Sequence, residues 1–156
     1  MTHVFQPLPD APQACELCQH AGGQLLWQQG DWRVIRVNDE AFPAFYRVIY
    51  KRHVAEFSQL PGPERQRCMQ LVAVVEKVLL SQLRPTKVNL AAFGNMVPHL
   101  HWHVVARFDW DSHFPQPIWG AKQREVTPPA VARLAMPLGT LDEAVVAALD
   151  GAARSA

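Results

Sequence analysis

The sequence has little net charge, few cysteines and no apolar segment of membrane-spanning length. Its 15 Lys and Arg residues nearly balance 14 Asp and Glu residues, which gives a formal net charge of +1. So close a balance provides no overall attraction to nucleic-acid backbones or acidic membranes, and we expect neither as a partner. Residues 1–7 lack the basic-then-apolar pattern of a secretion signal, so we expect no export and no membrane insertion.

The three cysteines are Cys15, Cys18 and Cys68. So small and odd a number is typical of a reducing compartment rather than of a disulfide framework, so we expect a cytoplasmic protein. Cys68 falls on the apolar side of a helical pattern and is expected in the core. Cys15 and Cys18 form a CxxC pair, which alone is compatible with half a zinc site, a redox pair or two unrelated surface cysteines. The redox role is disfavoured because no strand-then-helix pattern flanks the pair.

The order of apolar patterns along the chain predicts one α+β domain over residues 1–156. An apolar fraction of 49% in 156 residues is enough for a single hydrophobic core. Helical periodicity runs over residues 61–83, and Pro85 is expected to end the helix. Five segments have strand patterns, namely 24–28, 31–37, 46–50, 87–93 and 98–107. Their short connections predict an antiparallel sheet with the helix packed on one face.

Residues 109–156 divide into a loop and two expected helices. Residues 109–120 are rich in aromatic residues and proline and predict an ordered loop. Residues 127–134 and 141–149 predict two short helices, of which the second is amphipathic.

Three histidines alternate with apolar residues between Pro98 and Arg107. On a strand, His99, His101 and His103 would share one face while the residues between them face a core. Three imidazoles on one accessible face can bind phosphate, bind a metal or attack an electrophile. A catalytic metal site built from all three, and a solvated strand without a function, are the alternatives.

The sequence His99-x-His101-x-His103-Val104-Val105 resembles the signature of the histidine triad (HIT) family. In addition, residues 48–53 resemble the family strand that ends in a fourth histidine, and Asn89 resembles the asparagine of the strand before the triad. The resemblance covers about residues 15–108 and leaves 109–156 as a C-terminal tail. It implies a HIT-like α+β fold, with a five-stranded antiparallel sheet, one long helix on a face and a helical or irregular tail.

The resemblance also implies chemistry at the α-phosphate of a nucleotide, such as a dinucleoside polyphosphate or a nucleotide conjugate. The family hydrolyses or transfers the nucleotidyl group through a nucleotidyl-histidine, and its nucleophile corresponds to His101. His103 corresponds to the histidine that contacts phosphate oxygens, and His99 to the first histidine of the triad. The implied substrate-binding positions, besides His103, are Asn89, Gly94, Asn95 and Met96. A nucleotide-binding protein with little or no turnover is the alternative.

One position departs from the family pattern. Where the family often has Gly-Gln-Ser or Gly-Gln-Thr before the triad, this chain has Gly94-Asn95-Met96. Methionine has no proton to donate, so the sequence disfavours substrates with an amine leaving group, which needs a general acid. A phosphoanhydride has a better leaving group and is the expected substrate class.

A structural zinc site is implied by the same resemblance. Some HIT relatives, and the related galactose-1-phosphate uridylyltransferases, bind zinc through a CxxC pair, the fourth histidine and the first triad histidine. The matching residues are Cys15, Cys18, His53 and His99. Two thiolates and two imidazoles make a closed tetrahedral set, which would attach the N-terminal segment to two strand ends.

Residues outside these motifs carry less specific expectations. By analogy with the family we expect a homodimer, with residues 46–50, the start of the long helix and the aromatic tail as apolar surface. His113 and Trp119 either lie over the active site or pack against the sheet. Asp109 and Asp111 resemble a carboxylate pair, which nothing in the sequence brings near His101.

Overall fold

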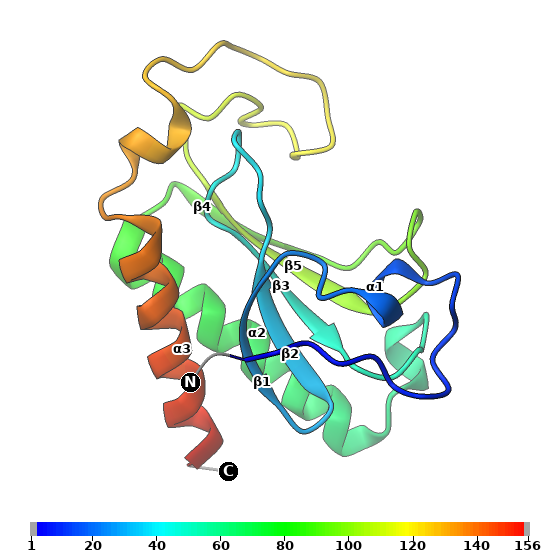
Figure 1. Ribbon diagram of the computed structural model, residues 1–156. Coiled ribbons are helices and arrows are strands. Elements are labelled where there is room, and N and C mark those ends of the chain that lie inside the picture. The colour runs from blue at the N-terminus through cyan, green and yellow to red at the C-terminus, as the bar shows by residue number, and fades with distance from the viewer. Residues whose placement is uncertain (1–2, 155–156) are drawn as a thin grey trace.

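The computed structural model describes residues 3–154 and is built on a sheet of five strands. The strands are β1 (Gln24–Gln29), β2 (Trp32–Arg36), β3 (Phe45–Tyr50), β4 (Lys87–Ala91) and β5 (His101–Arg107). They lie in the order β1-β2-β3-β5-β4, and every neighbouring pair is antiparallel (Figure 1). The predicted α+β fold on a five-stranded antiparallel sheet is confirmed.

Within residues 3–154, three α-helices and two 3₁₀ segments accompany the sheet. They are α1 (Glu16–Gln19), α2 (Gly62–Leu83) and α3 (Leu138–Arg154), with 3₁₀ turns at Phe57–Gln59 and Ala130–Arg133. Helix α2 has Pro63 in its first turn, and it ends where Arg84 adopts the left-handed conformation with φ of 48°. The helix predicted over residues 61–83 is thus confirmed, whereas α1 was not predicted.

The main core lies between the sheet and the two long helices, which run side by side in Figure 1. Leu71 and Leu79 of α2 and Leu141 and Leu149 of α3 are fully buried in this core. Each such side chain contributes about 1.5–3 kcal/mol by leaving water. Helix α3 therefore belongs to the same core as the sheet.

Polar contacts also tie α3 to the sheet. The hydroxyl of Tyr46 donates to Asp142 at 2.9 Å, and the indole of Trp27 donates to Asp150 at 2.9 Å. Arg36 donates to both oxygens of Asp142 at 3.0 Å. Because Asp142 is buried, these donors supply the partners that a desolvated carboxylate requires.

Strands β3 and β5 each present one face to the helices and the other to the candidate site. Val48 of β3 and Val104 of β5 lie in the core under the helices. Side chains alternate along a strand, so the residues between them point to the opposite face. In the antiparallel register His103 lies opposite Arg47, and His101 lies opposite Ile49.

Each predicted strand differs from the structure at one or both ends, most of all β4 and β5, and one predicted surface is wrong. Strand β5 begins at His101 rather than at residue 98, because the amide of Leu100 donates to Val54 outside the sheet. Strand β4 ends at Ala91 rather than at residue 93. Residues 46–50 offer no apolar surface for a dimer, because β3 is the central strand and its apolar side chains are buried.

The tail also differs in detail from its prediction. Residues 109–120 form an irregular loop, as expected. The helix predicted over 127–134 is reduced to the 3₁₀ turn Ala130–Arg133, and the one predicted over 141–149 extends over Leu138–Arg154. Within residues 3–154, no helix combines the length and the apolar character needed to cross a membrane.

Candidate active site and metal centre

His101 is held in one tautomer by the backbone of the histidine before it. Its Nδ1 lies 2.6 Å from the carbonyl oxygen of His99. A carbonyl only accepts, so Nδ1 carries the hydrogen and Nε2 keeps its lone pair. Burial lowers the pKa of His101, against the hydrogen bond to His99, which raises it. The ring is therefore a neutral imidazole with a free nucleophilic nitrogen.

His103 lies beside His101, with the two ring centroids 4.8 Å apart. Burial, together with electrostatic repulsion from His101 and Arg47, lowers the pKa of His103 to about 3. Its Nδ1 is buried and has no hydrogen-bond partner within the described part of the chain. The hydrogen-bonding capacity of this nitrogen is therefore not used by the described residues, and the ring itself lines the cavity over His101.

A cavity of about 570 Å³ opens over His101 and His103. That volume falls within the roughly 300–1,000 Å³ typical of small-molecule sites. The segment 93–97 forms one wall, Glu16 and Leu17 of α1 form another, and Trp119 completes it. Thus the structure brings the predicted positions 94–96 to the histidines, together with an N-terminal helix that was not expected there.

The wall formed by residues 93–97 offers backbone amides and the side-chain amide of Asn95 as donors, and it has no hydroxyl group. Gly94 has φ of 66°, a left-handed conformation that glycine adopts without steric cost. Turns of this kind direct backbone N–H groups toward a concave side, where they can bind an anion. Met96 is 93% exposed at the rim, and it contributes no hydrogen-bond donor.

Trp119 of the tail loop closes the far side of the cavity. Its ring centroid lies 4.9 Å from that of His103 and 4.8 Å from that of Phe93. Trp119 is 54% exposed, so a flat apolar surface remains open beside the histidines. His113 lies elsewhere: its ring packs on Phe42 at 5.2 Å. Of the two tail residues considered from the sequence, only Trp119 reaches the site.

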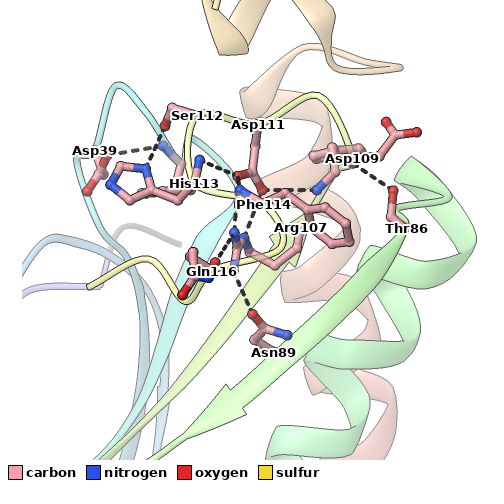
Figure 2. A network of polar contacts seen from close by, with 12 residues as sticks. Asp39, Thr86, Asn89, Arg107, Asp109, Asp111, Ser112, His113, Phe114 and Gln116 are labelled. Carbon is pink, nitrogen blue, oxygen red and sulfur yellow. Dashed lines mark hydrogen bonds and ion pairs between the residues drawn. The ribbon is translucent and has the colours of Figure 1, made fainter. Parts of the chain in front are cut away.

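Arg107 clamps the tail loop to the end of β5, as Figure 2 shows. Its guanidinium donates to both carboxylate oxygens of Asp111, at 2.8 and 3.1 Å, and to the carbonyl oxygen of Gln116 at 2.7 Å. It also donates to the side-chain oxygen of Asn89 at 2.8 Å. Asp111 is buried in this network while Asp109 is exposed, so the two carboxylates do not form a pair at His101.

Asn89 contacts Arg107 and lines a different cavity from the one over His101, a position that the sequence did not predict. Its amide oxygen is occupied by Arg107, and its side chain lines a second cavity of about 420 Å³. This cavity lies between β4 and residues 117–119, and His103 and Trp119 also border it. Asn89 therefore lies on the side of His103 away from the His101 ring.

Cys15, Cys18, His53 and His99 converge at the start of β5, next to the cavity. One potential ligand atom from each residue lies within 4.8 Å of all the others. The Nδ1 of His99 is 3.5 Å from Sγ of Cys15 and 3.3 Å from Sγ of Cys18, and Nδ1 of His53 is 3.4 Å from Sγ of Cys18. A tetrahedral zinc ion, with bonds of about 2.3 Å to sulfur and about 2.0 Å to nitrogen, sets sulfur–nitrogen distances of roughly 3.5 Å.

The hydrogen bonds around His99 prepare it for metal binding through Nδ1. Its Nε2 lies 2.5 Å from the carbonyl oxygen of Tyr50, so Nε2 carries the hydrogen and Nδ1 presents its lone pair to the sulfurs. Burial lowers the pKa of His99 to about 4, which keeps the ring neutral. Burial also raises the pKa of Cys18 to about 11, so a thiolate there requires a compensating cation. The donor set fits a metal ion.

Arg33 anchors α1, the helix that contains Cys18, and the turn that follows it. Its guanidinium donates to the carbonyl oxygens of Leu17 at 2.6 Å, His20 at 3.2 Å and Ala21 at 3.2 Å. These carbonyls belong to α1 and the turn that follows, so Arg33 fixes the segment that carries Cys18. Sequence reasoning did not find this role, because the partners are backbone atoms.

Arg47 is a further cavity residue that sequence reasoning missed. The available signal was its place in the strand sequence FYRVIY, where it is the single charged side chain. In a strand otherwise made of apolar and aromatic residues, a charged side chain is costly unless it meets a partner or a cavity.

Comparisons with known proteins agree with this arrangement. The sequence pattern of the HIT domain matches residues 20–110. No curated protein matches the chain. A crystal structure of a histidine triad protein from Marinobacter aquaeolei is 26% identical, with a TM-score of 0.66 over 84% of this chain and 91% of that one.

Two further crystal structures have a similar fold. A histidine triad protein from Bradyrhizobium japonicum is 24% identical and has a TM-score of 0.65, over 80% of this chain and 89% of that one. A histidine triad protein from Sinorhizobium meliloti is also 24% identical, with a TM-score of 0.64 over 81% of this chain and 90% of that one.

Proposed function

This chain belongs to the HIT family, and from that premise we propose that it hydrolyses or transfers nucleotidyl groups at the α-phosphate of a nucleotide. His101 is the nucleophile. The observation that carries the proposal is the 2.6 Å contact between His101 Nδ1 and the His99 carbonyl oxygen, which leaves Nε2 unprotonated. A cavity of about 570 Å³ lies over that ring and is large enough for a small-molecule substrate.

The reaction proceeds in two displacements. The Nε2 lone pair of His101 attacks the α-phosphorus, a P–N bond forms, and the P–O bond to the leaving group breaks with its electron pair on the leaving oxygen. Throughout this step Nδ1 of His101 keeps its hydrogen and donates it to the carbonyl oxygen of His99. A water molecule then attacks phosphorus and the P–N bond breaks. The products are a nucleoside monophosphate, one released proton and the neutral imidazole.

The neighbouring groups bind phosphate in this proposal. His103 offers a buried ring nitrogen without a protein partner, and its position beside His101 suits contact with phosphate oxygens. The backbone amides around Gly94 and Asn95 suit the same anion, because Gly94 has the left-handed conformation of an anion-binding turn. Asn89 holds the tail loop through Arg107 rather than contacting the reacting phosphate.

Met96 defines the substrate class. No hydroxyl side chain occurs among residues 93–97, so this wall supplies no general acid to a leaving amine. The proposed substrates are therefore phosphoanhydrides, such as dinucleoside polyphosphates, whose leaving group departs as a stable anion.

We assign zinc to the cluster of Cys15, Cys18, His53 and His99, on the basis of its donor set and its separations. A closed set of four protein ligands makes zinc a structural cross-link rather than a source of bound water. Here it attaches α1 to the ends of β3 and β5, and so keeps Glu16 and Leu17 in the cavity wall.

Trapping of the intermediate tests this function. The protein is mixed briefly with a dinucleoside polyphosphate, quenched and digested, and the peptide containing His101 is examined by mass spectrometry. A mass increase equal to one nucleoside monophosphate on His101, together with released nucleoside monophosphate, supports the proposal. Tight binding without adduct or turnover across a panel of bases and chain lengths would instead identify a nucleotide-binding protein.

A further inference from the structure

Arg47 has the position of a ligand-binding residue in the cavity. It lies directly opposite His103 in the register of β3 and β5, on the face that carries both histidines. Side chains opposite each other in an antiparallel pair have Cβ atoms about 4.5–5.5 Å apart. Arg47 also lines the cavity over His101 and His103, and it is the one Arg or Lys side chain among the lining residues.

The guanidinium of Arg47 has no polar partner in the part of the chain described. Its Nε is buried without a hydrogen bond, and no carboxylate lies within ion-pair distance of it. The guanidinium carbon lies over the ring of Phe45, 5.4 Å from its centroid. Glu16 lines the same cavity and acts on Arg47 only through its charge at longer range.

Three other arginines in this fold show how a buried guanidinium is normally satisfied. Arg36 is paired with Asp142, and Arg107 with Asp111. Arg33 donates to three backbone carbonyls. Arg47 is half-buried and lacks such partners, and a partly desolvated charge that lines a cavity marks a candidate ligand site.

We propose that Arg47 binds the anionic phosphates of the substrate and stabilises negative charge on the leaving group. This inference rests on the proposed function and names the substrate class more closely, as nucleotides whose leaving group is itself a phosphate. Arg47 donates hydrogen bonds and keeps its own proton, so the leaving oxygen departs as an anion with its electron pair. Met96 cannot protonate the leaving oxygen. The positive charge of Arg47, opposite His103, stabilises the negative charge on that oxygen instead.

The test compares Arg47→Met and Arg47→Lys with the wild-type protein. Methionine keeps the length of the apolar stem but removes the charge, whereas lysine keeps the charge without the planar fork. Arg154→Met at the exposed end of α3 is the matched control, because it removes an arginine charge far from the cavity. Calorimetry measures binding of AMP, GMP, CMP and UMP and of their nucleosides, and steady-state kinetics measures kcat/KM with a dinucleoside polyphosphate.

In Arg47→Met, affinity for the best monophosphate falls about 10- to 100-fold while affinity for its nucleoside is unchanged. Arg47→Lys loses less, and Arg154→Met loses nothing. Arg47→Met keeps or raises the melting temperature, because it removes a half-buried charge that has no protein partner among the described residues. A loss of melting temperature with equal losses for monophosphate and nucleoside would overturn the proposal in favour of a structural role.

The same experiment separates this inference from the proposed enzyme function. Turnover by the wild-type protein with unchanged monophosphate binding and kcat/KM in Arg47→Met would overturn only the role of Arg47. Phosphate-dependent binding that requires Arg47, in a protein with neither adduct nor turnover, would support the anion site and reject the enzyme. Absence of any monophosphate binding by the wild-type protein would overturn the role of Arg47.

Discussion

His99 and His101 are joined by a 2.6 Å hydrogen bond from the ring Nδ1 of His101 to the backbone oxygen of His99. The ring of His99 points in another direction, with Nδ1 at 3.3 Å from Sγ of Cys18 and Nε2 at 2.5 Å from the oxygen of Tyr50. His99 therefore contributes its side chain to the cluster of potential metal ligands, and its backbone carbonyl orients the ring of His101, the proposed nucleophile. The two sites are adjacent and chemically separate.

Replacement of one cysteine tests the metal assignment. Cys15→Ser should lower bound zinc, measured by atomic absorption, from about one ion per chain to a small fraction, because serine is a poor zinc ligand. Its free energy of unfolding should fall by several kcal/mol, on the order expected when a structural zinc site is lost. Cys68→Ala is the control: Cys68 is buried in the main core, outside the cluster, so it should lose some stability and no zinc. Full zinc content in Cys15→Ser would contradict the assignment.

Replacement of the proposed nucleophile should abolish covalent chemistry without unfolding the chain. His101→Asn should lower kcat at least about a thousandfold and eliminate the nucleotidyl adduct, because asparagine has no nucleophilic ring nitrogen. Circular dichroism checks that the fold persists. His20→Asn serves as the control, since the His20 side chain is exposed and distant in role from the triad. An adduct that forms normally in His101→Asn would show that another residue is the nucleophile.

Much of this arrangement could be predicted from periodicity. Strict alternation correctly separated the histidine face from the apolar residues that pack under the helices, and the pattern around Cys68 and Leu79 correctly predicted α2. The alternation even persists outside the sheet, because Leu100 packs in the main core while His99 faces the cysteines. Periodicity reports on local geometry, so it performs best where each residue alternates between two environments.

What sequence reasoning missed depends on partners distant in the chain. Arg107 pairs with Asp111 only four residues along the chain, but it also donates to Asn89 of another strand, and no local pattern identifies that second partner. Likewise, the cavity role of Arg47 arises because β5 pairs with β3, so that His103 becomes its neighbour. Such roles follow from strand order, which the sequence does not state.

Breaking the buried ion pair should loosen the tail loop. Asp111→Asn leaves Arg107 without its counter-charge, and removal of one partner of a buried pair costs about 3–5 kcal/mol of unfolding free energy. The double variant Arg107→Met with Asp111→Asn should cost less than Asp111→Asn alone, because no unpaired charge remains and the asparagine oxygen still accepts from the backbone amides of the loop. Urea denaturation at pH 7 measures both. A double variant less stable than the single one would contradict the importance of the buried charge.

The same carboxylate should contribute to acid sensitivity. Burial opposes ionisation of Asp111, but the hydrogen bonds from Arg107 and from the amides of His113 and Phe108 outweigh it and lower its pKa below 3.8. The unfolded chain therefore binds this proton at a higher pH than the folded chain does. The stability that Asp111 contributes is fully present above about pH 4 and is lost as the pH falls through its lowered folded-state pKa. Denaturation curves from pH 6 to pH 2 should have a shallower acid slope in Asp111→Asn than in the wild-type protein.

The leaving-group preference can be shifted at one exposed position. Met96 is 93% exposed at the cavity rim, so Met96→Ser should leave the melting temperature unchanged. A serine hydroxyl there can donate a proton, and it should raise kcat/KM for a nucleoside phosphoramidate by about tenfold or more, with little change for a dinucleoside polyphosphate. Met69→Ser on α2 controls for the loss of an exposed methionine elsewhere. Equal changes for both substrates would mean that the residue at position 96 affects binding rather than protonation, and the absence of a hydroxyl would then not explain the substrate class.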